Sequence, residues 1–168
     1  MEGDGAWIDS NGGPLLLLPE SALSGWRGVD GPASGETDYE RACAVLDVGF
    51  IPVGARQGLV LADEPLPTRV YRDAPNLSLL RWRFAPSDRA VDELLAQPLP
   101  SLTWEPIGVL AANGEALVLF DSAFPGDDIV GASTRVSLSP GEYVIETAEF
   151  SPSSEIALQL VRFRALAA

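Results

Sequence analysis

The chain has 168 residues, of which 46% are hydrophobic and 21% are charged, and its formal net charge is −13. Its length and composition exclude wholesale disorder and favour a single globular domain over residues 6–168, preceded by a flexible tail at residues 1–5. The negative charge disfavours binding to nucleic acid or to an anionic membrane, because both carry the same sign of charge.

The first elements of the chain are short and separated by turn formers. Trp7-Ile8 and Leu15–Leu18 predict two short strands, with the turn sequence Asn11-Gly12-Gly13-Pro14 between them. Pro19 can occupy the first turn of a helix, because that position needs no N–H donor. The sequence therefore predicts a short helix after Pro19, with Trp26 on one of its faces.

Strand patterns dominate the rest of the first half. Two apolar segments on either side of a glycine-containing turn, residues 50–53 and 58–62, predict a hairpin. The segment 77–84 alternates in hydropathy, which predicts a strand whose Arg81 and Arg83 face solvent.

A second helix is predicted over residues 88–95. Ser87 is a favourable N-cap, and Asp88 suits the positive end of the helix dipole. Apolar residues then recur at helical spacing, and Pro98 ends the element.

The second half repeats the strand theme. Residues 108–112 and 116–120 flank Asn113-Gly114, which is the strongest short-range hairpin signal. Residues 135–138, 143–150 and 156–164 are joined by turn sequences and predict an antiparallel meander. The expected fold class is β-rich α+β, with antiparallel sheets and two short helices.

The two halves also echo each other. The segment 51–63 resembles 107–121, and each half later contains an Arg-aromatic-Arg element, at residues 81–83 and 162–164. A duplication would give two similar β units in one domain, whereas generic strand composition would give the same echo by coincidence.

Several classes of catalytic site are excluded by composition. The chain has no histidine and no lysine, so the usual Ser-His-Asp and Cys-His sites, histidine metal sites and Schiff bases cannot form. Cys43 is the only cysteine, and in its apolar context it is interpreted as a small buried hydrophobic residue. No internal disulfide can form, which favours a reducing compartment, the cytoplasm. No catalytic residue, cofactor or metal ion is expected.

Acidic residues cluster where predicted strands end. Asp63 and Glu64 follow one strand, Asp121 follows its counterpart, and Asp127 and Asp128 lie in the next loop. Carboxylates at such positions serve a carboxylate-based hydrolase, hold a divalent cation, or simply lie on solvated turns, which is the commonest case.

Four pieces of the sequence have a distinctive order and spacing, which are Trp7–Ser21, Trp26, Asp38–Cys43 and Leu59–Pro65. In these pieces the chain resembles the immunity protein 21 family of bacterial polymorphic toxin systems. The resemblance is strongest over about residues 6–71 and weaker through the C-terminal strands. One departure is Ala62, at a position where the family pattern has glycine.

The resemblance implies a small cytoplasmic protein that binds a cognate toxin domain and blocks it, without catalytic residues of its own. An acidic protein would suit a basic toxin such as a nuclease. The candidate contacts with the toxin are the acidic residues Asp63, Glu64, Asp121, Asp127 and Asp128, with Tyr39 and Trp26 as anchors. A carboxylate-based hydrolase, a cation-binding protein and a small-ligand-binding β module remain as alternatives. The chain is expected to be a monomer or a weak dimer.

Overall fold

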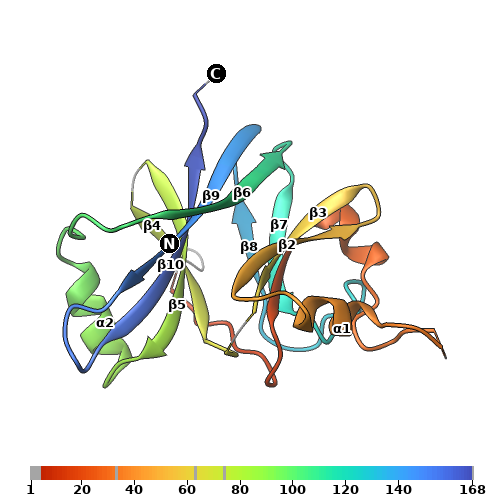
Figure 1. Cartoon of the computed structure of the whole chain (residues 1–168), viewed down its shortest axis with the longest axis horizontal. Helices are drawn as coiled ribbons and strands as arrows, with labels where there is room; N and C mark the ends of the chain where they lie inside the picture. Colours follow the sequence, from red (N-terminus) through yellow and green to blue (C-terminus); the bar gives the residue numbers. More distant parts are fainter. Residues whose placement is uncertain (1–4, 33, 63, 74, 168) are drawn as a thin grey trace.

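The structure, a computed structural model, describes residues 5–32, 34–62, 64–73 and 75–167 (Figure 1). Its strands form two antiparallel sheets of five strands each, and three short helices complete the fold. The predicted β-rich α+β class is therefore confirmed. Residues 1–4 of the predicted tail lie outside the described residues.

The first sheet has the strand order β2-β3-β1-β7-β8. Its central strand β1 consists of five buried residues, because both faces of this strand are covered. The bounds are β1 (Leu15–Pro19), β2 (Val48–Val53), β3 (Arg56–Leu61), β7 (Ala116–Asp121) and β8 (Thr134–Ser137). The hairpin predicted from residues 50–53 and 58–62 is confirmed as β2 and β3.

The second sheet has the strand order β4-β5-β10-β9-β6. Its longest strands, β5, β9 and β10, lie side by side at the centre and pair over most of their length. The bounds are β4 (Thr68–Asp73), β5 (Asn76–Phe84), β6 (Glu105–Ala112), β9 (Gly141–Phe150) and β10 (Ala157–Ala165).

The main core lies where the two sheets face each other. Alternate residues of β1, Leu15 and Leu17, point into it from the first sheet, and Leu79 and Val161 point into it from the second. The other alternate residues, such as Leu16 and Leu18, belong to a separate core on the outer face of the first sheet. The period of two along a strand thus lets β1 contribute to both cores.

Helices and loops cover the outer faces of both sheets (Figure 1). On the first sheet the cover consists of the 3-10 helix η1 (Glu20–Gly25), the helix α1 (Asp38–Cys43) and the loop after β7. On the second sheet α2 (Asp88–Leu95) packs through its buried Val91, and the Ser87 side chain caps it as predicted. No helix in the described segments is long and apolar enough to cross a membrane.

Two strand pairings differ from the sequence prediction. Asn113-Gly114 does form a turn, with the Asn113 side chain accepting from the backbone N–H of Glu115 at 3.0 Å. The turn does not make a hairpin, because β6 pairs with β9 in one sheet and β7 pairs with β1 in the other. Likewise β9 and β10 pair as expected, but β8 belongs to the first sheet, so the predicted meander is wrong at its first strand.

The strands with similar sequences in the two halves pair differently in the two sheets. The strands β3 and β7 both run antiparallel to β1, so they are parallel to each other. The strands β5 and β10 are direct neighbours and antiparallel to each other. Duplication and similar strand composition therefore both stay open as explanations of the similarity.

Candidate functional site

The acidic positions singled out in the sequence gather toward one end of the first sheet. Leu15, the first residue of β1, pairs with Leu61 at the end of β3 and with Asp121 at the end of β7. The segments that follow β3 and β7 therefore leave the sheet on the same side. Asp63 lies outside the described residues, whereas Glu64 is described and exposed.

Asp121 is a buried structural residue and not a surface contact. Only 3% of it is exposed, and its carboxylate accepts hydrogen bonds from the backbone N–H groups of Asn11 at 2.8 Å and Ala123 at 3.0 Å. A carboxylate that accepts two backbone N–H groups fixes the loops to which they belong. Asp121 thus joins the loop before β1 to the loop after β7, and we do not retain it as a toxin contact.

Trp26 is also part of the interior. Its ring is fully buried in the outer core of the first sheet, and its Nε1 donates to the carbonyl oxygen of Ser122 at 2.9 Å. Its own carbonyl accepts from the backbone N–H of Gly126 at 2.9 Å. A side chain with no exposed surface cannot anchor a partner without unfolding the loop around it, so Trp26 supports the surface from beneath.

Tyr39 lies on α1 and is half-buried against the loop before β1. Its hydroxyl lies so close to Gly13 that a Cβ at that position would be 2.4 Å away, which explains the glycine there. Interaction with Cys43, burial and the negative charge of Asp121 together raise the pKa of Tyr39 above its ordinary value. Cys43 itself is exposed, so the prediction that it is buried is wrong.

Two neighbouring segments, residues 26–46 and 122–133, form a surface that we call the acidic cap. They are held together by hydrogen bonds from Val29 N–H to the Ala123 carbonyl at 3.0 Å and from Gly126 N–H to the Trp26 carbonyl. The only basic residues in these segments are Arg27 and Arg41, and Arg41 is paired with Asp38 at 2.7 Å. The exposed acids of the cap are Asp30, Glu36, Glu40, Asp127 and Asp128.

Half of this surface was not predicted from the sequence, because α1 was not expected there. A signal was present, since Thr37 and Glu40 have the spacing of a capping box. In the structure the Thr37 hydroxyl accepts from the Glu40 N–H at 3.1 Å, and the Glu40 carboxylate accepts from the Thr37 N–H at 2.7 Å. The helix places Glu40 on the surface beside the loops.

Arg81 was expected on a solvent-facing side of β5, and this prediction is wrong. The residue is 1% exposed, because the strand lies at the centre of a sheet covered on both faces. Its guanidinium donates to Gln159 Oε1 at 2.7 Å and to the carbonyl oxygens of Ala62 and Glu64 at 2.8 and 3.1 Å. Arg81 thus connects the second sheet to the segment after β3. Arg83 is more exposed and binds Glu149 through two hydrogen bonds.

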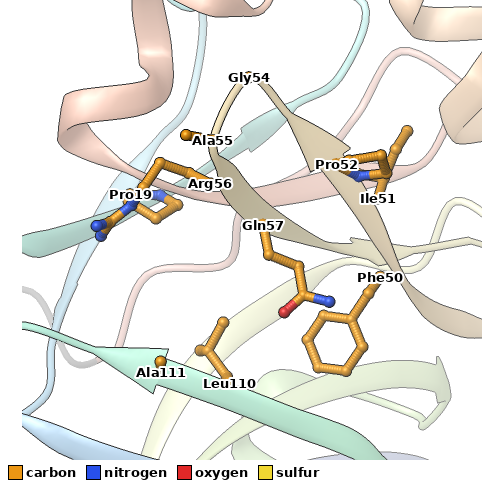
Figure 2. Close-up of a pocket in the computed structure, with 10 residues that line it drawn as sticks. All are labelled: Pro19, Phe50, Ile51, Pro52, Gly54, Ala55, Arg56, Gln57, Leu110 and Ala111. Carbon is orange, nitrogen blue, oxygen red and sulfur yellow. The ribbon is translucent and has the colours of Figure 1, made fainter.

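The larger hollows lie at the two open sides of the sandwich, where edge strands of the two sheets face each other. One, of about 490 Å³, lies between the β2–β3 hairpin and β6, and Figure 2 shows Phe50, Gln57 and Leu110 pointing into it. The other, of about 630 Å³, lies between the turn before β5 and the end of β8. Neither is enclosed by the main core, so the structure gives the small-ligand alternative no interior pocket among the residues that it describes.

The carboxylates do not assemble a recognisable ion site either. Within the described segments, no group of three or more acidic or cysteine side chains is arranged to hold a metal ion. The exposed acids of the cap are spread over separate segments, and such a surface can attract and orient a positively charged partner over its whole width.

The model of the family Immunity protein 21 matches residues 6–156. The chain belongs to the immunity protein 21 family. For this immunity protein the match extends over both sheets, well beyond the N-terminal segments that first suggested the family. No curated protein and no solved structure matches the chain.

Proposed function

We propose that this immunity protein binds one cognate toxin domain and neutralises it by stoichiometric inhibition, with the acidic cap as the main contact surface. The observation that carries the proposal is the row of exposed acids on segments 26–46 and 122–133, with Arg27 as the cap's only arginine outside the Arg41–Asp38 pair. Family membership supports the immunity role.

Hydrogen bonds hold the backbone of the cap in place, so its charged side chains extend from fixed positions. The Trp26 side chain joins the two segments from beneath by its hydrogen bond to Ser122, and Asp121 fixes the start of the second segment through Ala123 and ties it to the loop before β1 through Asn11. Loops that are already ordered lose little conformational entropy when they are covered by a partner. The cap therefore favours a toxin domain with a basic surface, and a nuclease is the class of toxin that such a charge fits best.

Inhibition by covering requires no chemistry from the immunity protein. A stable complex of this kind buries about 1,600 Å² in total, with a few anchor residues inside a polar rim. The acids steer the approach of the toxin and exclude partners with the wrong charge, while close packing sets the lifetime of the complex. Half-buried Tyr39 belongs to the cap and is its candidate anchor, and exposed Glu64 is a further candidate contact outside the cap.

The first experiment is co-expression with the toxin domain encoded beside the gene, scored by survival of the cells and by co-purification. The proposal expects rescue and a complex with one copy of each protein by calorimetry. The association rate should fall steeply as salt rises, because the Debye length shortens to ~8 Å at physiological ionic strength. If the cells are not rescued and no complex forms, the proposed function is rejected. If the association rate does not depend on salt, the role of the cap is rejected.

A further inference from the structure

Leu46 is the most exposed of the large hydrophobic residues in the described part of the chain. Its exposed fraction is 89%, and the next highest is 62%, at Val130. It ends an uncharged apolar run at the close of α1, in which Cys43 and Ala44 are exposed as well. Single exposed leucines are common on protein surfaces, so exposure alone does not indicate a site. The backbone that presents Leu46 adds the second observation.

The turn after Leu46 is held in an uncommon conformation. Asp47 has a φ of 54°, and it is the only residue other than glycine with positive φ in the described segments. Its carbonyl accepts from the Ala62 N–H at 2.6 Å, and its Oδ1 accepts from Gln159 Nε2 at 2.9 Å. These bonds, one from the residue after β3 and one from β10, fix the turn on which Leu46 is exposed. Backbone conformations of this kind are concentrated at functional positions.

The surface next to this turn is hollow and acidic. A cavity of about 420 Å³ is lined by Asp47, by Glu105 at the start of β6 and by Glu149 on β9, and no arginine lines it. Glu149 is bound to Arg83, and Asp47 lies 3.9 Å from Arg81. Glu105 forms no ion pair with the residues that the structure describes. The charge of Glu105 is therefore not balanced by an ion pair among these residues, and it favours a basic side chain from outside at this hollow.

We infer that Leu46 is the apolar anchor of the toxin interface and that the hollow lined by Asp47, Glu105 and Glu149 receives a lysine or arginine of the toxin next to it. The inference rests on the proposed function and deepens it. The patch is continuous with the acidic cap, because Leu46 is the last residue of the cap segment 26–46, three residues after α1 ends at Cys43. A second copy of this chain fits less well, since both copies carry a charge of −13.

The partner surface is thereby specified in chemical terms. It offers a small apolar depression that accepts a leucine, next to a positively charged side chain. An exposed apolar side chain that becomes buried on binding, inside a rim of charged residues, has the arrangement of an interface core. Binding through this turn also brings both sheets of the immunity protein to the interface.

The test uses the full-length protein and the toxin domain encoded beside its gene. Leu46→Ala is expected to weaken the complex by about tenfold or more, mainly through faster dissociation, and Leu46→Glu by more. The control Leu166→Ala removes an exposed leucine near the C-terminus, far from Leu46 in the sequence, and is expected to leave affinity unchanged. Because Leu46 is exposed, all of these variants should fold and melt like the wild type, which circular dichroism checks.

The hollow is tested by Asp47→Asn and Glu105→Gln. Asparagine can keep the positive φ and the hydrogen bond from Gln159 while removing the charge. The pair of changes is expected to reduce affinity at low salt and to have little effect at high salt. Wild-type affinity in both Leu46 variants would overturn the inference while leaving the proposed function standing. If the wild-type protein forms no complex with the toxin domain, both the inference and the proposed function are rejected. Self-association that Leu46→Ala abolishes would assign the patch to a second copy and overturn the inference too.

Discussion

Gln159 on β10 donates a hydrogen bond of 2.9 Å from its Nε2 to Oδ1 of Asp47, which lies 112 residues earlier in the chain. The same side chain accepts a hydrogen bond from Arg81 through its Oε1. One buried amide therefore joins β5 and β10 of the second sheet to the turn before β2 of the first sheet. Gln159 is 1% exposed. The contact fixes the position of the second sheet relative to the turn that carries Leu46.

Replacing this amide should destabilise the protein. We expect Gln159→Leu to lower the free energy of unfolding by about 2–3 kcal/mol, because the Arg81 guanidinium and the Asp47 carboxylate each lose a buried partner. Urea denaturation followed by fluorescence measures it. The matched control is Gln57→Leu at an exposed position on β3, for which we expect a change of about 0.5 kcal/mol or less. Equal effects at both positions would show that the network is not stabilising.

Trp26 and Asp121 should affect stability and not toxin contact. Trp26→Phe loses the hydrogen bond to Ser122 and leaves space in the outer core, which should cost about 2 kcal/mol. Asp121→Asn loses charge-assisted bonds to Asn11 and Ala123 and should cost about 1–2 kcal/mol. Affinity for the toxin, measured below the melting transition, should change less than threefold. A calcium-dependent rise in melting temperature that Asp121→Asn abolishes would instead support the cation-binding alternative.

The Glu146 carboxylate gives the stability of the protein a dependence on acidic pH. The hydrogen bonds and charges of Arg164 and Arg162 hold its pKa below the ordinary value of 4.5, and burial only partly opposes them. Because the folded pKa is the lower one, this stabilisation is complete above about pH 4.5 and is lost as pH falls through the folded value.

Removing the carboxylate should therefore matter most at neutral pH. We expect Glu146→Gln to lower the free energy of unfolding at pH 7 by about 1–2 kcal/mol, and the gap from wild type to shrink below pH 4.5. Denaturant titrations between pH 3 and pH 7 measure the gap. Glu155→Gln makes the same charge change at an exposed loop position and serves as the control. If the difference in stability between wild type and Glu146→Gln stays constant with pH, the carboxylate of Glu146 is not the source of the pH dependence.

The charges of the acidic cap should govern the speed of toxin binding. Asp127→Asn with Asp128→Asn should slow association several-fold at low salt, with a smaller effect on dissociation. Stopped-flow measurements at two ionic strengths separate these effects. Glu142→Gln with Glu155→Gln removes the same charge from exposed positions outside the cap. If this control slows association equally, only the net charge matters and the cap has no directional role.

Local signals in the sequence were sufficient for several elements of the fold. The apolar run Leu15–Leu18, the N-cap Ser87 and the glycine-containing turn between β2 and β3 each determine a strand, a helix or a hairpin through neighbouring residues. The helix α1 was not predicted although its capping box is local, since its six residues are too few to show a helical repeat of apolar positions.

Strand partners and burial could not be predicted, because they depend on distant residues. Asn113-Gly114 specifies a turn, but β7 pairs with β1, about a hundred residues earlier in the chain, and not with β6. Asp121 and Trp26 were candidate toxin contacts, as an acid and an aromatic near loops. Their burial is set by Asn11 and Ser122, which lie 110 and 96 residues away respectively. No pattern in a single sequence carries that information.

The four edge strands are not equally protected. On one open side of the sandwich β8 carries Arg135 and β4 carries Arg72, whereas β2 and the β6 residues Ile107–Ala112, beside the hollow in Figure 2, carry no charge at all. Charged side chains, prolines and bulges on an edge normally prevent sheets of different molecules from joining. On β6 such features are confined to its start, at Glu105, Pro106 and the irregular pairing that follows. The rest of β6 depends on the net charge of the whole molecule, which vanishes near the isoelectric point of about 4.2. Solubility of this protein is consequently a property of its total charge, and purification or storage at mildly acidic pH would expose a ready site for aggregation.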